Sequence, residues 1–424
     1  MVGTMAEIDD SVKKKVPELR FKGFTDDWEE RKLGEVGNTF TGLSGKTKED
    51  FGHGEGKFIT YMNVFSNPVA DLDGLESVEI DNKQFQVKAG DVLFTTSSET
   101  PEEVGMSSMW LGNADNIYLN SFCFGYRPTI EFDKYYLAFM LRSAPIRKKF
   151  QLLAQGISRY NISKNKVMEM SIPVPSIEEQ ELLGAFFNNL NQTIALHQRK
   201  LDLLKEQKKG YLQKMFPKNG AKVPELRFAG FADDWEERKL SSGLREYTDR
   251  VIVEDDKEYY QISVRNNFGG ITLRGSKIGN KIGRKRQAKI NLTKYPQTLI
   301  FTRQTVEQGG IGWVDKYCDG AIVTENMPTI SLDTSVFSKY FLTNLFQTRI
   351  FYKNAILDNI EGGSAQIAIH ESKFLSSILL FPNLDEQEKI GQFFKQLDNT
   401  IALHQRKIDL LKEQKKGFLQ KMFV

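Results

Sequence analysis

The stretch "TIALHQRKLDLLKEQKKGYLQKMF" at residues 193–216 returns as "TIALHQRKIDLLKEQKKGFLQKMF" at residues 400–423, 207 residues later. A second pair keeps the same offset, with "VPELRFKGFTDDWEERKL" at 16–33 and "VPELRFAGFADDWEERKL" at 223–240. Self-similarity at a fixed period indicates a repeated structural unit. The chain is therefore interpreted as a tandem duplication of one unit.

Between the repeated segments lie two divergent middles, at about 34–175 and 241–382. Weaker matches keep the register, because Gly105 falls on Gly312 and Pro175 falls on Pro382. What both halves do alike is expected in the repeated segments. What they do differently is expected in the middles.

The repeated end of each unit has the pattern of a long helix. Ser176 with Glu179, and Asn383 with Glu386, fit capping boxes at the two helix starts. Core-like residues then follow a 3-4 spacing over about four heptads, which predicts a coiled-coil seam. The predicted seam residues are Phe187, Leu190, Ile194, His197, Leu201 and Leu204 in the first copy, and Phe394, Leu397, Ile401, His404, Ile408 and Leu411 in the second.

One such apolar stripe cannot bury itself, so the twin helix is the expected partner. An antiparallel pairing would place the two middles at opposite ends and bring residue 424 near the start of the chain. His197 and His404 are interpreted as polar residues that set the register of the seam.

The fold expected is α+β. It has two mixed α/β domains separated by an antiparallel pair of long coiled-coil helices, with an internal pseudo-twofold repeat. The expected boundaries are a disordered leader at 1–15, a first domain at 16–175, a central helix at 176–216, a second domain at 217–382 and a distal helix at 383–424.

The middles alternate short β-rich runs with turn residues, which predicts curled antiparallel sheets. Appended helices are expected in "DKYYLAFMLRSAPIRKKFQLLA" (133–154) and "SKYFLTNLFQTRIFYKNAIL" (338–357). The repeated "DDWEERK" is interpreted as a helix-like structural segment whose acids make surface and partner contacts.

The most basic segment is "RGSKIGNKIGRKRQAK" (274–289), which has no acid and is suited to follow phosphates. Polar clusters "TTSSET" (95–100) and "TRQT" (302–305) fall at equivalent repeat positions and suit base-edge hydrogen bonds. Solvated charge and drifted loop sequence remain the alternatives. The candidate DNA-binding residues are Lys46, Lys48, Ser97, Ser98, Arg159, Asn161, Arg274, Lys277, Lys281, Arg284, Lys285, Arg303 and Gln304.

No catalytic motif is complete. "GLSGKT" (42–47) ends like a phosphate-binding loop but has Phe40 where that motif needs glycine. Two cysteines without CxxC spacing predict neither a disulfide framework nor a metal site, and favour a cytoplasmic location. No apolar run reaches the length of a membrane span. A net charge of +3 decides nothing about nucleic acid.

The chain resembles the specificity subunit of type I restriction-modification systems. The resemblance rests on the duplicated "VPELRF" openings, on the "EEQ" (178–180) and "DEQ" (385–387) helix entries, and on the repeated "LHQRK" helices. It implies that each domain reads half of a bipartite DNA target, and that the helices set the spacer.

The resemblance further implies that the repeats dock two DNA methyltransferase subunits and that nuclease/translocase subunits join the complex. S-adenosylmethionine, ATP and Mg²⁺ are then expected on those partners, with no cofactor and no chemistry on this chain. The alternative is a two-domain coiled-coil adaptor that binds proteins. Steep salt dependence of binding would favour DNA.

Overall fold

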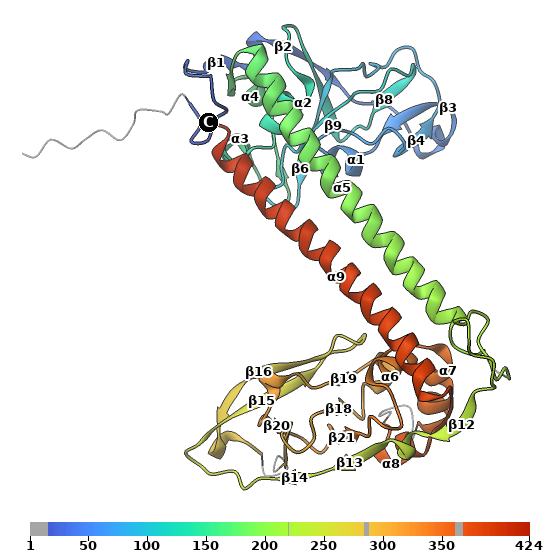
Figure 1. Cartoon of the computed structure of the whole chain (residues 1–424). Helices are drawn as coiled ribbons and strands as arrows, with labels where there is room; N and C mark the ends of the chain where they lie inside the picture. The colour runs from blue at the N-terminus through green and yellow to red at the C-terminus, as the bar shows by residue number, and fades with distance from the viewer. Residues whose placement is uncertain (1–15, 219, 284–287, 361–367) are drawn as a thin grey trace, which may run out of the picture. The chain divides into compact units, whose positions relative to one another are not determined.

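The computed structural model describes residues 16–218, 220–283, 288–360 and 368–424, and the expected leader lies outside them. The chain divides into two compact units (Figure 1). Unit 1 comprises the described residues up to Gln198 together with Arg406–Val424, and unit 2 comprises Arg199–Gln405. Each unit therefore contains one divergent middle and a stretch of both long helices.

Unit 1 is built on small sheets of mixed direction. A four-stranded antiparallel sheet has the order β2-β9-β5-β7, formed by Gly37–Thr41, Cys123–Pro128, Val92–Thr95 and Ser107–Met109. A three-stranded sheet has the order β4-β3-β8, formed by Leu75–Val78, Phe51–Ile59 and Ile117–Leu119. Two-stranded pairs join β1 to β11 and β6 to β10, formed by Glu29–Lys32 with Ser171–Val174 and by Ser97–Ser98 with Tyr160–Asn161.

Among the described residues, unit 2 repeats three of these four sheets and enlarges one of them. Its four-stranded sheet has the matching order β13-β21-β18-β19, formed by Leu244–Tyr247, Thr329–Leu332, Thr298–Phe301 and Ile311–Trp313. Its second sheet has five strands, β14-β17-β20-β15-β16, formed by Asp249–Arg250, Ala288–Lys289, Ile322–Val323, Glu258–Val264 and Ile271–Ile278. The pair β12 with β22 is formed by Glu236–Lys239 and Ile378–Phe381. The added strands lie where the two sequences diverge.

Most strand pairs are antiparallel, as expected. One pair in each unit runs parallel, β3 with β8 and β15 with β20. The sequence pattern missed this because alternation of apolar residues is the same for both directions.

The predicted helical stretches of the middles are each broken. In unit 1 the short helices are α1, α2, α3 and α4, at Tyr61–Ser66, Lys134–Met140, Ala144–Leu153 and Lys164–Met168. In unit 2 they are α6, α7 and α8, at Lys339–Leu345, Arg349–Phe351 and Glu371–Ser376. Pro145 in the first turn of α3 explains one break, because proline cannot donate to the preceding turn.

Single turns complete the local structure. The 3-10 turns are Leu33–Glu35, Lys48–Asp50, Leu240–Ser242, Gly279–Lys281, Val306–Gln308, Lys316–Cys318 and Leu357–Asn359. A short π-helical segment is formed by Tyr352–Ile356.

The helix-like interpretation of "DDWEERK" is wrong. Its last four residues form β1 and β12, which pair residue by residue with β11 and β22. Trp28, directly before β1, is buried in the unit 1 core and anchors the strand. Tertiary pairing with a segment far along the chain outweighs the local helix propensity of the charged residues.

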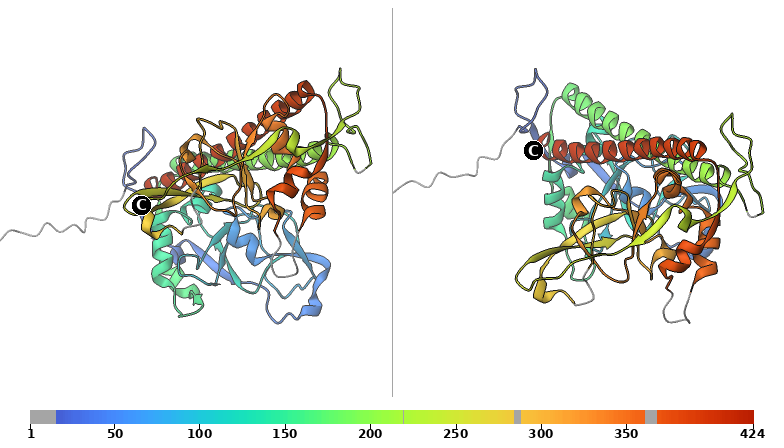
Figure 2. Two further views of the ribbon diagram at one scale, coloured as in Figure 1. Left: turned by 90° about the horizontal axis from the view of Figure 1, so that it is seen from below. Right: turned by 60° about the horizontal axis from the view of Figure 1, so that its bottom comes forward.

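The two long helices are confirmed. Helices α5 (Ile177–Lys214) and α9 (Leu384–Lys421) have 38 residues each, and the right-hand view of Figure 2 shows α9 along its length. Ser176 Oγ accepts the Glu179 amide at 3.4 Å, and Asn383 Oδ1 accepts the Glu386 amide at 2.9 Å. This is one half of each predicted capping box. The glutamate side chains do not complete the boxes, because their carboxylates bind arginine side chains instead.

Those arginines come from the repeated openings. Arg20 donates from Nε and Nη2 to the two carboxylate oxygens of Glu179 at 2.7 and 2.8 Å, and Arg227 binds Glu386 at 2.7 Å in the same way. Both glutamates are almost fully buried. Bidentate pairs of this kind fix geometry as well as charge. They attach each "VPELRF" opening to the start of the helix in its own copy.

The helices run antiparallel within each unit. In unit 1, Lys415 Nζ donates to Asn191 Oδ1 at 2.9 Å, and the Phe187 and Phe423 ring centroids lie 5.3 Å apart. Residue numbers thus rise along α5 as they fall along α9. In unit 2, Lys208 pairs with Asp398 at 2.7 Å. The Tyr211 and Phe393 rings there lie 5.0 Å apart, in the same sense.

The predicted seam positions lie on the less exposed face of the two helices. Six of them are buried, namely Phe187, Leu201, Leu204, Phe394, Ile408 and Leu411. The others, including His197 and His404, are half-buried, whereas most neighbouring positions of the helices are exposed.

Each domain core is completed by the end of a long helix. Met422 and Phe423 pack into the core of unit 1, and the Lys421 carbonyl accepts the Leu19 amide at 2.8 Å. The C-terminus therefore lies near the first repeated opening, as expected. In unit 2, Met215 and Phe216 take the same places in the core. This shared packing explains why "LQKMF" is identical in both copies.

Candidate nucleic-acid interface

The structure joins two of the predicted polar sites of the first domain. Strand β6 pairs with β10, so that Ser97 lies opposite Asn161 and Ser98 opposite Tyr160. Both serines are buried, whereas Asn161 and the neighbouring Arg159 are exposed. The exposed pair is therefore available for contacts, and the serines shape the strand beneath them.

An exposed apolar residue beside this pair was missed by sequence reasoning. Ile157 is 96% exposed and lies between Gly156 and Arg159. Gly156 has φ +139°, and a Cβ there would come within 2.1 Å of the Arg159 carbonyl oxygen, so the turn requires glycine. The sequence signal that could have identified Ile157 is an isoleucine inside a polar turn that contains glycine. Apolar side chains of this kind contact thymine methyl groups in the major groove.

The two lysines near the start of the first domain differ. Lys46 is half-buried, and its Nζ lies 3.1 Å from Asp81 and 3.8 Å from Asp50. Its hydrogen bond with Asp81 raises the pKa of Lys46, so its charge is compensated locally. Lys48 is exposed in the 3-10 turn Lys48–Asp50.

The basic segment of the second domain lies on β16 and the turn after it. Arg274, Lys277 and Lys281 are exposed there. Arg284 and Lys285 lie outside the described residues. Tyr260 on the paired strand β15 is 54% exposed opposite Ser276, which adds an aromatic face to this basic hairpin. Aromatic and basic side chains together suit nucleic acid.

The clusters "TTSSET" and "TRQT" occupy the same backbone frame. The Thr96 amide donates to the Phe122 carbonyl and the Thr96 carbonyl accepts the Ile162 amide, both at 3.0 Å. Arg303, 207 positions later, makes the matching pair with Asn326 and Ile369, again at 3.0 Å. The backbone is thus the same and the side chains differ.

The two predicted residues in "TRQT", Arg303 and Gln304, differ in their contacts. The Arg303 guanidinium donates to Glu371 at 2.9 Å and ties the strand end to α8. Gln304 is exposed. Gln304 thus has a side chain open to solvent, whereas Arg303 is already paired.

No group of three or more His, Cys, Asp or Glu side chains in the described ranges is placed to hold a metal ion. Among the same residues, no helix combines the length and the apolar character that crossing a membrane requires.

The chain matches the sequence model of the type I restriction modification DNA specificity domain twice, at residues 25–206 and 233–413. These matches cover most of the chain, and their offset agrees with the internal repeat. The fold and its two repeated domains thus define a DNA-specificity component. The chain belongs to the family of type I restriction-modification specificity subunits. As such it is a non-catalytic recognition subunit.

The chain is also similar to curated relatives, and solved structures share its fold. The MjaX and MjaVIII specificity subunits of type I restriction enzymes from Methanocaldococcus jannaschii are each 22% identical, over 93% and 82% of this chain and 92% and 82% of their own. The crystal structure of a type I S subunit from M. genitalium superposes with a TM-score of 0.59 at 12% identity, covering 96% of this chain and 99% of that one. A chain from a structural study of the assembly of a type I restriction-modification system superposes with a TM-score of 0.54 at 16% identity, covering 92% of this chain and 96% of that one.

Proposed function

We propose that the two domains each read one half of a bipartite double-stranded DNA target. The observation that carries this is the shared backbone frame at Thr96 and Arg303, which holds different side chains in the two domains. Identical scaffolds with different exposed residues suit two readers of different sequences. In the first domain the reading residues are Asn161 and Arg159, with Ile157 beside them. In the second they are Gln304 and the basic hairpin.

The long helices are proposed to set the spacer between the half-sites. Each is a continuous helix of 38 residues, which spans about 57 Å at 1.5 Å per residue. Continuous helices transmit a fixed length, in contrast to flexible linkers.

The repeats are proposed to dock two methyltransferase subunits. The face of each helix turned away from the seam carries large exposed leucines at a seven-residue spacing. Leu196 and Leu403 are each 67% exposed, and Leu203 and Leu410 are 52% and 51% exposed. These four, the outer leucines, are identical at offset 207. Because the sites are duplicated, two partners per chain are expected. Nuclease/translocase subunits would join that core, and a cytoplasmic location follows from the proposed role.

Charge substitutions distinguish the role of the outer leucines in docking from the role of the seam in stability. The double variant L203E with L410E is expected to keep the chain folded and to weaken methyltransferase binding at least about tenfold, because interface anchors carry most of the affinity. Isothermal titration and native mass spectrometry of the assembly measure this, with two partners per chain expected for the unaltered protein. Retained affinity, or a one-to-one limit, would contradict the docking proposal.

The matched control lies one position along the helix. Leu204 is 6% exposed in the seam. Leu204→Glu removes its apolar burial, a loss of about 1.5–3 kcal/mol before the cost of the buried charge. It should lower the melting temperature of the isolated chain, which the outer-leucine variants leave unchanged.

The proposed function is tested by mapping adenine methylation genome-wide in cells with the methyltransferase, with and without this chain. A split methylated sequence should occur only when the chain is present. Its gap should have one constant length, since rigid helices fix it. Methylation that is independent of the chain would refute the role in specificity, and a variable gap would refute the spacer.

A further inference from the structure

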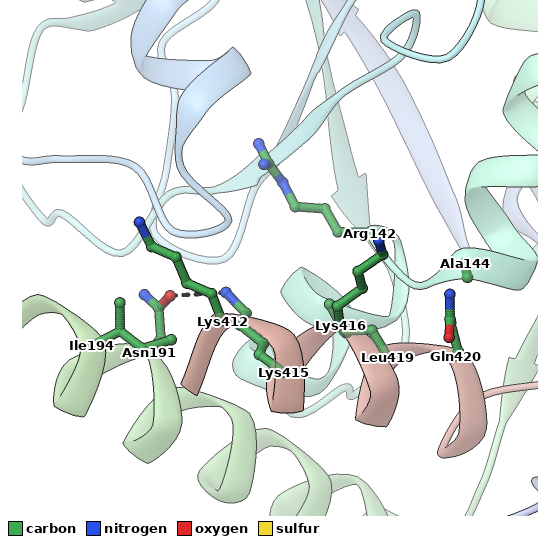
Figure 3. A pocket seen from close by; sticks show the side chains of 9 residues that line it. All are labelled: Arg142, Ala144, Asn191, Ile194, Lys412, Lys415, Lys416, Leu419 and Gln420. Carbon is green, nitrogen blue, oxygen red and sulfur yellow. Dashed lines mark hydrogen bonds between the residues drawn. The ribbon is translucent and has the colours of Figure 1, made fainter. Parts of the chain in front are cut away.

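A cavity of about 390 Å³ in unit 1 lies between the α2–α3 junction and the two long helices. Figure 3 shows its lysines leaving α9 on the side of the cavity. The lining residues are Arg142, Ala144, Asn191, Ile194, Lys412, Lys415, Lys416, Leu419 and Gln420, which we call the basic pocket. Four of these nine are cationic and none is acidic. Glu413, the acid of the same helical segment, is exposed and does not line the cavity.

The two most buried cations of the basic pocket are held by neutral groups. Arg142 donates to the backbone carbonyl oxygens of Ser107, Val64, Phe65 and Asn67 at 2.6–3.0 Å. Lys415 donates to the amide oxygen of Asn191 at 2.9 Å and lies over the Phe139 ring. These contacts fix the side chains without cancelling their charge.

Burial destabilises the charged forms of Lys415 and Arg142. Burial, with repulsion from Arg142, lowers the pKa of Lys415 to about 8. Burial lowers the pKa of Arg142 to about 9, with a further contribution from Arg147. An anion in the pocket would relieve both effects.

The second copy of the repeat supplies the comparison. Lys208 is the counterpart of Lys415 at offset 207, and Asp398 is the counterpart of Asn191. There the lysine forms an ion pair with Asp398 at 2.7 Å. Gln347, which like Arg142 lies eight residues after the start of its helix, accepts a hydrogen bond from Lys208 at 3.4 Å. Unit 2 thus carries its own counter-charge, whereas unit 1 has a neutral amide in place of the carboxylate and a guanidinium in place of the glutamine.

Attraction to the negative end of the helix dipole explains why lysines occur at the ends of both helices. It does not explain the difference between Asn191 and Asp398. We propose that the basic pocket of unit 1 binds a phosphate group in the place that a carboxylate fills in unit 2. The ammonium groups of Lys412, Lys415 and Lys416 suit a phosphate, whose oxygens accept several hydrogen bonds, and the buried charge of Arg142 adds to the positive potential.

The phosphate could belong to the DNA backbone or be free in solution, and the former case rests on the proposed function. The decisive variant is Asn191→Asp, which gives unit 1 the carboxylate of unit 2. The matched control is Gln192→Asp, which makes the same charge change at the next, exposed residue of α5.

In the first arm, inorganic phosphate is added to the full chain at constant ionic strength, and the thermal midpoint is followed. Phosphate should raise the midpoint of the native chain and of the Gln192→Asp variant. Its apparent affinity should fall about tenfold or more in Asn191→Asp, because a charge-assisted bond is replaced by repulsion. In the second arm, target DNA binding by the complete methyltransferase assembly is measured against salt. If the phosphate belongs to DNA, Asn191→Asp should reduce the salt slope by about 1.

A phosphate response without a change in salt slope assigns the pocket to free phosphate, and both responses together assign it to DNA. A change in salt slope confined to Asn191→Asp, even without stabilisation by free phosphate, also supports a DNA phosphate. Neither response, in a chain that binds its target DNA, overturns the pocket and leaves the proposed function intact. A phosphate response in a chain that binds no DNA refutes the proposed function and leaves the pocket standing.

Discussion

Replacing residues 34–175 by the chain's own residues 241–382 is expected to erase the first half-site from the methylated DNA sequence and to duplicate the second. The original target should lose methylation by at least about a thousandfold, the usual gap between specific and non-specific binding. Both middles begin after nearly identical openings and end before equivalent helices. Their four-stranded sheets share one strand order, so the graft meets a matching frame.

The packing at the graft supports this exchange. In unit 1, the ring centroids of Phe423 and Tyr136 lie 5.9 Å apart. In unit 2, the ring centroids of Phe216 and Phe341 lie 5.3 Å apart at the corresponding place of its core. The helix end should therefore find an aromatic partner in either domain. Genome-wide methylation mapping reads the result, and the reciprocal replacement of 241–382 by 34–175 is the control. A graft that altered both halves of the target would contradict independent reading.

Glu179→Gln is expected to lower the stability of the chain by about 2 kcal/mol, because it leaves the largely buried Arg20 without its counter-charge. The carboxylate is 1% exposed and raises the pKa of Arg20 through its hydrogen bonds. Glu386→Gln should cost about the same, because the Arg227 pair has the same geometry. Glu178→Gln, at the exposed neighbour, should change stability little. Chemical denaturation of the full chain measures all three.

The two tryptophans of the openings refine this prediction. Trp28 Nε1 donates to Glu179 Oε2 at 3.0 Å, whereas Trp235 Nε1 finds no acceptor among the described residues. Both side chains are buried, so Trp→Phe leaves a similar cavity in each core. Trp28→Phe should therefore cost about 1 kcal/mol more than Trp235→Phe, the usual net worth of one hydrogen bond. Equal costs would show that the indole bond contributes nothing.

The sequence alone determined the features that repeat along it. The offset of 207 located both units, and the 3-4 spacing predicted a seam of twelve residues, six of which the structure buries. These features are local or periodic, because a helix sets its faces by spacing along its own chain. The twin stripes then required a partner, but the direction of pairing within each unit is shown only by contacts such as Lys415 with Asn191 and Lys208 with Asp398.

Tertiary structure alone decided which distant residues meet. It paired β1 with β11, placed Asn161 opposite Ser97, and engaged Arg303 with Glu371. It also set Lys415 beside a neutral Asn191 where the second copy has an ion pair. Such contacts depend on strand pairing and packing across large separations, which no local period encodes. The charge left uncompensated in the basic pocket became visible only when these residues were brought together.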